Sequence, residues 1–169
     1  MVAWILIGMM GAGKSTIGSL LADKTNRKFI DTDKLIEQRL GRPVSQFFKH
    51  YGESAFRDHE ASVIQSLASG PLVIATGGGA ILQAQNFDHL KSIGKVIYLK
   101  SDPDELIRRL QKSKVRRPLL NTEDWEAKLK AILESRRELY ETADFIVAVD
   151  SDDQKNVVTK LLDLLDGDH

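Results

Sequence analysis

Short apolar runs alternate along the chain with longer segments in which apolar positions recur every three or four residues. The short runs are rich in β-branched residues and are mostly continuous rather than alternating, which is typical of strands in a parallel sheet covered by helices on both faces. They predict five strands, over residues 4–7, 28–30, 72–75, 95–99 and 145–149. The pattern therefore predicts an α/β fold of three αβα layers around a five-stranded parallel sheet.

The longer segments predict helices over residues 14–24, 34–40, 44–51, 53–68, 86–92, 103–112, 125–142 and 153–165. Pro103 suits the first turn of its helix because proline lacks the N–H that would go unsatisfied there, and Asp102 is placed to cap that turn. Residues 112–123 interrupt the pattern, since they are basic, contain Pro118 and show no clear period. A connection of this length predicts a lid or a disordered segment.

The composition, with 42% hydrophobic and 28% charged residues, favours one domain over residues 1–169. The 24 basic and 24 acidic side chains cancel, so the net charge points to neither nucleic acid nor an anionic membrane as partner. The apolar start of the chain lacks a preceding basic segment and is too short to span a membrane. It is better explained as a strand.

Cysteine is absent, which excludes disulfides and cysteine metal sites and is compatible with a cytoplasmic location. The four histidines are scattered and show no zinc-site spacing. No long exposed apolar stripe requires a second chain, so we expect a monomer.

Residues 8–15 have the sequence Gly-Met-Met-Gly-Ala-Gly-Lys-Ser, between the first predicted strand and the first predicted helix. Glycines let the main chain wrap around phosphate oxygens, and the following helix points its positive dipole end at them. Lys14 would place its ammonium group against the β and γ phosphates of ATP, and Ser15 would offer its hydroxyl to Mg²⁺. A chance glycine-rich turn is the alternative, but the complete pattern in its strand–loop–helix context favours nucleotide binding.

Asp31, Thr32 and Asp33 follow the second predicted strand. Ligands of an open parallel sheet bind beyond the carboxyl ends of its strands, so we expect these acids to face the same crevice as the glycine-rich loop. Thr32 or Asp33 could instead simply cap the helix that follows. Two carboxylates beside a magnesium–phosphate site favour the functional interpretation.

Gly77, Gly78 and Gly79 follow Thr76 at the end of the third predicted strand. Three successive glycines at this edge of the sheet allow close approach of the backbone to a ligand. A structural tight turn is the alternative, but such a turn rarely needs three glycines. We interpret this segment as a binding loop.

Arg57 and Arg136 lie on otherwise apolar stripes of their predicted helices, so both should face inward. A buried guanidinium group needs an anionic partner because an unpaired buried charge is costly. The partner could be a protein carboxylate such as Glu60 or the carboxylate of a substrate. Two such arginines near a glycine loop suggest the substrate.

Arg117 stands in the run Arg-Arg-Pro-Leu-Leu over residues 116–120, within the irregular segment. A solvated basic run is one explanation. A lid that brings an arginine onto the transferring phosphate is the other.

Five motifs together resemble those of shikimate kinase: residues 8–16, 29–33, 56–57, 76–79 and 117–120, in an order and spacing that cover nearly the whole chain. The resemblance implies a P-loop fold of the nucleoside-monophosphate-kinase type, with ATP and Mg²⁺. It also implies transfer of the γ-phosphoryl group of ATP to the 3-hydroxyl of shikimate, a step of aromatic amino-acid biosynthesis through chorismate.

The resemblance further assigns roles to individual residues. Contacts with the nucleotide are implied for Gly11, Ala12, Gly13, Lys14, Ser15, Thr16, Arg109, Arg117 and Gln154. Contacts with shikimate are implied for Asp33, Arg57, Gly77, Gly78, Gly79 and Arg136, with the arginines on its carboxylate. Ser15 and, through water, Asp31 would support Mg²⁺. Lys14, Asp33 and Arg117 are the expected catalytic residues, and Arg116 could share the role of its neighbour.

Two rival functions stay open. A kinase of the same architecture that acts on gluconate or a nucleoside monophosphate would share the donor side of the site. A nucleotide-operated switch or binding module would need no acceptor. The chain lacks the Asn-Lys-x-Asp guanine motif of GTPase switches, and an idle module would need neither inward arginines nor three glycines at the sheet edge.

Overall fold

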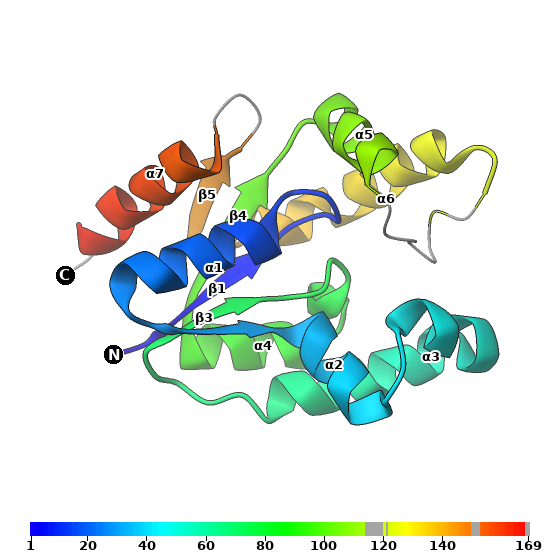
Figure 1. Cartoon of the computed structure of the whole chain (residues 1–169), viewed down its shortest axis with the longest axis horizontal. Coiled ribbons are helices and arrows are strands. Elements are labelled where there is room, and N and C mark those ends of the chain that lie inside the picture. Colours follow the sequence, from blue (N-terminus) through cyan, green and yellow to red (C-terminus); the bar gives the residue numbers. More distant parts are fainter. Residues whose placement is uncertain (114–119, 121, 150–152, 168–169) are drawn as a thin grey trace.

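The computed structural model describes residues 1–113, 120, 122–149 and 153–167, along which strands and helices alternate (Figure 1). Within these ranges the strands are β1 Ala3–Ile7, β2 Lys28–Asp31, β3 Leu72–Ala75, β4 Gly94–Lys100 and β5 Phe145–Ala148. The α-helices are α1 Lys14–Thr25, α2 Thr32–Leu40, α3 Val44–Gln65, α4 Ala84–Ile93, α5 Pro103–Lys112, α6 Trp125–Tyr140 and α7 Gln154–Asp166. A short 3₁₀ helix that the sequence pattern did not predict, η1, spans Ala80–Leu82. The five predicted strands are confirmed.

The sheet is parallel, with the strand order β2-β3-β1-β4-β5. The central strand is β1, where Ile5 pairs with Ile74 of β3 on one side and with Val96 of β4 on the other. Every residue of β1 is buried, because helices cover both faces, and this explains its continuous apolar run. Since all strands run the same way, the segments that follow β1, β2 and β3 meet at one edge of the sheet.

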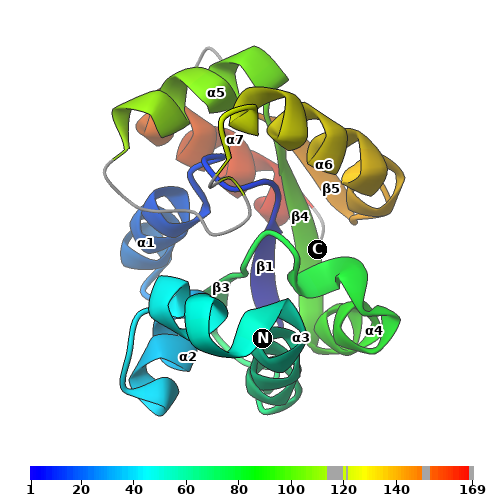
Figure 2. The same ribbon diagram turned by 90° about the vertical axis from the view of Figure 1, so that its right-hand side faces the viewer.

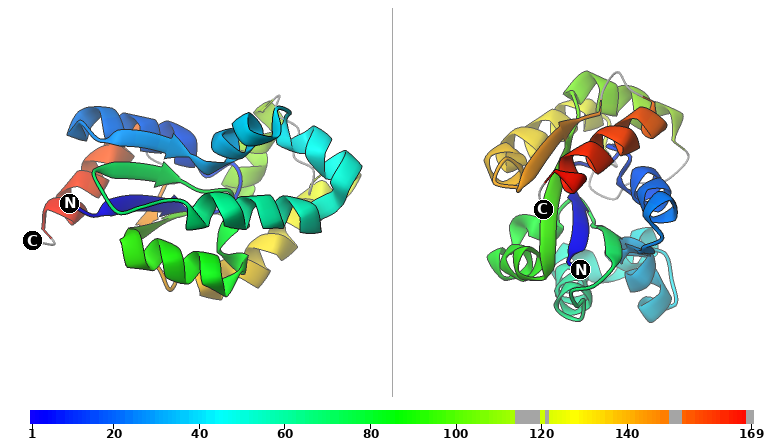
Figure 3. Two further views of the ribbon diagram at one scale, coloured as in Figure 1. Left: turned by 90° about the horizontal axis from the view of Figure 1, so that it is seen from below. Right: turned by 90° about the vertical axis from the view of Figure 1, so that its left-hand side faces the viewer.

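Helices cover both faces of this sheet, as the predicted three-layer fold requires. One face carries α1 and α7, and the other carries α3, α4 and α6 (Figures 2 and 3). Helix α1 packs on α7 and β3, whereas α4 packs on α3 and β4. The main hydrophobic core fills the space between these layers.

A second, smaller hydrophobic cluster lies on α2 and α3 and contains Ile36, Phe47, Phe56 and Val63. Helix α3 is broken at Gly52, whose φ of 81° and ψ of 176° are readily adopted only by glycine. This break explains why the sequence pattern predicted two helices on either side of residue 52.

Two aspartates cap helices at the carboxyl edge of the sheet. Asp102 accepts a hydrogen bond of 2.9 Å from the N–H of Asp104, which confirms the predicted cap of α5. Asp31 accepts one of 3.2 Å from the N–H of Lys34, so α2 begins at Thr32. The capping role considered for Thr32 or Asp33 therefore belongs to Asp31.

Across the described part of the chain, no helix is both long enough and apolar enough to cross a membrane.

Candidate active site at the carboxyl edge of the sheet

The glycine-rich loop joins the end of β1 to the start of α1 through residues with positive φ. These are Gly8 at 147°, Gly11 at 84° and Gly13 at 92°. A β-carbon on Gly8 would lie 2.8 Å from the carbonyl oxygen of Leu99, so the close approach of the loop to β4 also requires glycine. Because α1 begins directly after Gly13, its unpaired N–H groups and positive dipole end lie at the loop. This arrangement is suited to an anion such as a phosphate chain.

Lys14 lies inside this loop. Its side chain is buried, and its Nζ donates hydrogen bonds to the carbonyl oxygens of Gly8 at 2.7 Å and Met9 at 2.9 Å. These contacts hold the ammonium group where the loop would enclose a phosphate. The next two residues, Ser15 and Thr16, lie in the exposed first turn of α1.

Ser15 and Asp31 are brought together from α1 and β2. The Ser15 hydroxyl donates a hydrogen bond of 2.5 Å to Oδ2 of Asp31. Hydroxyl and carboxylate oxygens are ligands that Mg²⁺ prefers, and this ion usually takes its remaining ligands from water and substrate phosphates. Within the described residues no group of three His, Cys, Asp or Glu side chains could hold a metal. The Ser15–Asp31 pair supplies one hydroxyl and one carboxylate oxygen of the kind that Mg²⁺ prefers.

The loop of Gly77, Gly78 and Gly79 lies next to both the acidic side chains and the glycine-rich loop of the site. A β-carbon on Gly77 would lie 2.8 Å from Oδ1 of Asp33 and 2.8 Å from Oε2 of Glu60. The N–H of Gly77 also donates a hydrogen bond of 3.1 Å to the buried Thr32 hydroxyl, which ties the loop to the start of α2. The first glycine therefore lies against two carboxylates.

The other two glycines lie against the glycine-rich loop and the two predicted arginines. A β-carbon on Gly78 would lie 3.5 Å from the carbonyl oxygen of Gly8 and 3.6 Å from Nη1 of Arg136. A β-carbon on Gly79 would overlap the guanidinium group of Arg57. Side chains at these three positions would fill the space where the acids, the arginines and the glycine-rich loop converge.

Arg57 has protein carboxylates as partners, which was one of the two alternatives considered from the sequence. Its Nη1 lies 2.6 Å from Oε1 of Glu60, and its Nη2 lies 3.3 Å from Oε1 of Glu53. Glu60 is almost fully buried, and its Oε2 has no hydrogen-bond partner among the described residues. Burial raises the pKa of the Glu60 carboxyl above its ordinary value, against the opposing effect of Arg57. Sequence reasoning named Glu60 only as a possible partner and missed its place beside Gly77.

Arg136 is the second inward arginine, and only 5% of it is exposed. Its Nη1 lies 3.9 Å from Sδ of Met9, in the glycine-rich loop. No ion pair joins Arg136 to an Asp or Glu within the part of the chain that the structure describes. A buried guanidinium group in this position is suited to an anionic ligand between it and the Gly77–Gly79 loop.

A cavity of about 380 Å³ opens on the other side of the glycine-rich loop. This volume lies in the range of small-molecule sites. Its lining consists of Gly11, Ala12, Gly13, Ile17, Arg109, Val149, Asp153, Gln154 and Val157. Arg109 and Gln154 thus share a wall with the loop that precedes α1.

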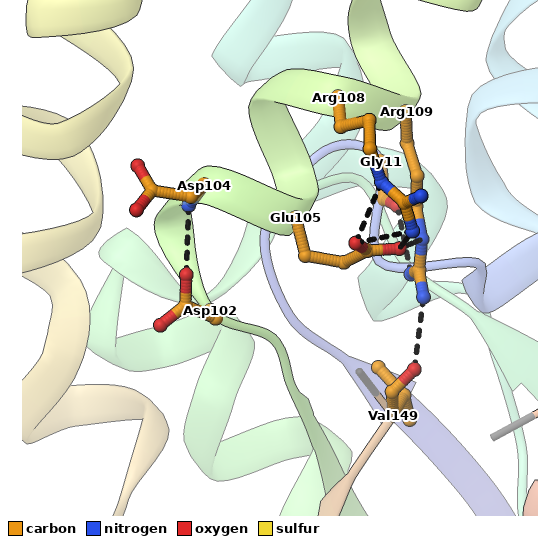
Figure 4. A network of polar contacts seen from close by, with 7 residues as sticks. All are labelled: Gly11, Asp102, Asp104, Glu105, Arg108, Arg109 and Val149. Atoms are coloured by element: carbon orange, nitrogen blue, oxygen red, sulfur yellow. Dashed lines mark hydrogen bonds and ion pairs between the residues drawn. The ribbon is translucent and has the colours of Figure 1, made fainter. Parts of the chain in front are cut away.

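Arg109 is held in that wall by three contacts (Figure 4). Its Nε donates to Oε1 of Glu105 at 3.0 Å and its Nη2 to the carbonyl oxygen of Val149 at 2.8 Å. Its Nη1 donates a longer hydrogen bond of 3.4 Å to the carbonyl oxygen of Gly11. The side chain therefore connects α5 and the end of β5 to the glycine-rich loop.

The predicted lid is largely beyond the described part of the chain. Arg117 and its neighbour Arg116 lie outside the described residues, so the geometry above includes neither.

Comparison with known proteins gives one consistent family. The family model for shikimate kinase matches residues 10–166. The chain is 42% identical to the shikimate kinase of Psychromonas ingrahamii, covering 95% of both chains, and 43% identical to that of Chromobacterium violaceum, covering 98% of this chain and 91% of the other. It is similar in structure to a shikimate kinase from Acinetobacter baumannii solved in complex with shikimate, with a TM-score of 0.92, 37% identity, and coverage of 99% and 94%.

Proposed function

This chain belongs to the shikimate kinase family and is an ATP-dependent phosphotransferase of the shikimate pathway, and we propose that the site described above transfers the γ-phosphoryl group of ATP to the 3-hydroxyl of shikimate. The products are ADP and shikimate 3-phosphate. One observation carries the assignment of the site: β-carbons on the three glycines of the Gly77–Gly79 loop would meet Asp33, Arg57, Arg136 and the glycine-rich loop.

The glycine-rich loop and α1 form the donor side. Backbone N–H groups of Gly11 to Gly13 and of the first turn, including Thr16, bind the phosphates of ATP. The Lys14 ammonium group offsets the charge that develops on the transferring phosphoryl group. Its burial and its bonds to two loop carbonyls support this role, because the charge is already held inside the phosphate loop. Arg109 and Gln154, in the cavity beside this loop, lie near the adenine.

Ser15 and Asp31 support Mg²⁺, the Asp31 carboxylate acting through a water molecule. When bound, the ion would offset the negative charge of the ATP phosphates. The hydrogen bond between the two side chains supports this assignment, since it holds both sets of oxygens at the edge of the phosphate loop.

The acceptor side binds a small hydroxylated carboxylate. Arg57 and Arg136 bind its carboxylate, Asp33 binds its hydroxyls, and the Gly77–Gly79 loop, through Gly79 above all, contacts its ring through the backbone. Guanidinium groups match a carboxylate in a bidentate manner, which favours arginine over lysine at such positions. The burial of Arg136 supports this division of roles.

Phosphoryl transfer requires mainly that donor and acceptor oxygens be aligned and that the developing charge be offset. Asp33 orients the reacting hydroxyl, and it either accepts the proton of that hydroxyl or only holds the hydroxyl in position. From the family motif we propose that Arg117 closes over the phosphates, with Arg116 as the competing assignment.

A coupled assay of ADP release tests the function. We expect turnover with shikimate and little with gluconate or a nucleoside monophosphate. Absence of turnover with shikimate would overturn the proposal, and turnover with one of the other acceptors would favour the rival kinase. If shikimate also gave no heat of binding by calorimetry, with or without ADP, the binding-module alternative would be favoured.

Replacing Gly79 by alanine should raise the KM for shikimate about tenfold or more, because displacement of a binding group by about 1 Å costs up to two orders of magnitude. The new β-carbon would overlap the guanidinium group of Arg57, which must then move. The KM for ATP should change less than about twofold, since the donor side is left intact. Steady-state kinetics with each substrate varied in turn measures both values.

Gly167→Ala is the matched control, because Gly167 has a φ of −79° and its β-carbon would come no closer than 3.4 Å to another atom. It should leave both KM values unchanged. An equal rise in the KM for ATP and for shikimate in Gly79→Ala would count against a specific acceptor role for this loop.

A further inference from the structure

Tyr140 connects the last turn of α6 to the middle of the Gly77–Gly79 loop. The residue is fully buried, and its hydroxyl donates a hydrogen bond of 2.6 Å to the carbonyl oxygen of Gly78. Its ring stacks on Tyr98 of β4, with 4.9 Å between centroids and 16° between planes. The hydroxyl is therefore fixed by packing as well as by its hydrogen bond.

This hydrogen bond also determines the direction of the N–H of the next residue, Gly79. The carbonyl of Gly78 and the N–H of Gly79 belong to one planar peptide unit, and in a trans peptide they point in opposite directions. No peptide bond of the described chain is cis. Holding the carbonyl toward Tyr140 therefore turns the Gly79 N–H away from α6.

The loop is also closed by a turn, in which the N–H of Ala80 donates a hydrogen bond of 3.1 Å to the carbonyl oxygen of Gly77. Turns of types I and II differ in the direction of their central peptide, which here is Gly78–Gly79. Glycine restricts its own dihedral angles less than any other residue, and three glycines follow one another here. The neighbouring glycine is tied through its own N–H, which donates to the Thr32 hydroxyl. The carbonyl of Gly78 is thus a further point of attachment, and it fixes the direction of the central peptide of the turn.

We propose that Tyr140 is a positioning residue, whose hydroxyl orients the Gly78–Gly79 peptide so that the Gly79 N–H faces the acceptor substrate. The inference rests on the proposed function, in which the backbone of Gly79 contacts shikimate. Tyr140 lies one helical turn after Arg136 on α6. Helix α6 therefore supplies Arg136 for the acceptor and also orients one backbone donor, the N–H of Gly79.

A purely structural role for the hydroxyl makes a different prediction. A buried tyrosine hydroxyl usually finds a partner, and its loss would then lower the thermal stability alone. A positioning role predicts a selective loss of shikimate binding, because the N–H of Gly79 loses its fixed direction. The Tyr140 hydroxyl also interacts with the guanidinium group of Arg136, so the amide resonance of Gly79 is the readout that reports on the peptide itself.

Tyr140→Phe removes the hydroxyl and keeps the ring. We expect the KM for shikimate to rise about tenfold, as for the loss of one well-placed hydrogen bond, with the KM for ATP within about twofold of wild type. The amide resonance of Gly79 should also shift in the substrate-free protein. Tyr98→Phe, which removes a hydroxyl from the other ring of the stacked pair, is the matched control and should change none of these values.

Equal effects on both substrates, or an unchanged KM for shikimate, would overturn the inference even if the melting temperature fell. An unchanged Gly79 resonance would overturn it as well, and this readout needs no substrate. Failure of the proposed function would instead appear as absent turnover of shikimate by the wild type. If Tyr140→Phe does not fold, the wild-type protein provides the test. The NMR order parameter of the Gly79 amide, measured without substrate, should be about 0.85, and a value below about 0.6 would contradict a fixed peptide.

Discussion

Replacing Lys14 by methionine is expected to lower kcat/KM for shikimate phosphorylation by about 10³-fold or more, equivalent to ~4 kcal/mol of transition-state stabilisation. Methionine keeps much of the length of the side chain but removes the charge. The ammonium group is held inside the glycine-rich loop by the carbonyls of Gly8 and Met9. It therefore offsets charge on the phosphoryl group without having to move far. The coupled ADP-release assay measures the effect.

Lys24→Met is the matched control, because Lys24 lies exposed in the last turn of the same helix. It should keep kcat/KM close to that of wild type. Activity of Lys14→Met within tenfold of wild type, in a protein that melts normally, would contradict the assignment of this loop to ATP.

Replacing Asp33 by asparagine is expected to lower kcat/KM by about 10² to 10³-fold. The substitution keeps the size of the side chain, but an amide cannot accept the proton of the substrate hydroxyl. Asp33 also lies in the first turn of α2, where a negative charge favours the helix by about 0.3–1 kcal/mol. A loss of this size lowers stability slightly and does not account for the loss of rate.

Asp58→Asn controls for the loss of an acidic group near the acceptor side. Asp58 follows Arg57 on α3 and is exposed, so its variant should behave as wild type. A kcat/KM of Asp33→Asn within about threefold of wild type would remove Asp33 from both the catalytic and the substrate-binding roles.

Much of the fold could be predicted because its strands are buried on both faces. Such strands are continuous apolar runs, and the five runs in the sequence correspond to β1 to β5. Their spatial order could not be deduced from the pattern alone, since periodicity indicates which residues are covered but not which strand lies beside which. The break at Gly52 left a signal in the sequence, whereas η1 is too short to show a period.

The site could be predicted in part because its motifs follow strands or interrupt apolar stripes. Asp33, Arg57 and Arg136 were predicted in this way, and the structure brings all three close to the Gly77–Gly79 loop, while their roles stay predictions. Glu60 was harder to place, because its burial against Gly77 depends on how α3 packs. The hydrogen bond of Tyr140 to Gly78 joins residues 62 positions apart, and Tyr140 itself looks like one more apolar position of its helix.

Several expectations from the sequence stay predictions. They include the roles of the individual site residues, the binding of Mg²⁺, the closure of Arg117 over the phosphates, the single domain, the monomeric state and the cytoplasmic location.

A crystal structure of the chain with ADP and shikimate tests the central claim most directly. We expect the ADP phosphates on the loop from Gly8 to Ser15. We expect shikimate between Asp33 and the Gly77–Gly79 loop, with its carboxylate on Arg57 and Arg136 and one hydroxyl facing the phosphate site. Shikimate bound away from these residues, or with its carboxylate directed at neither arginine, would contradict the account.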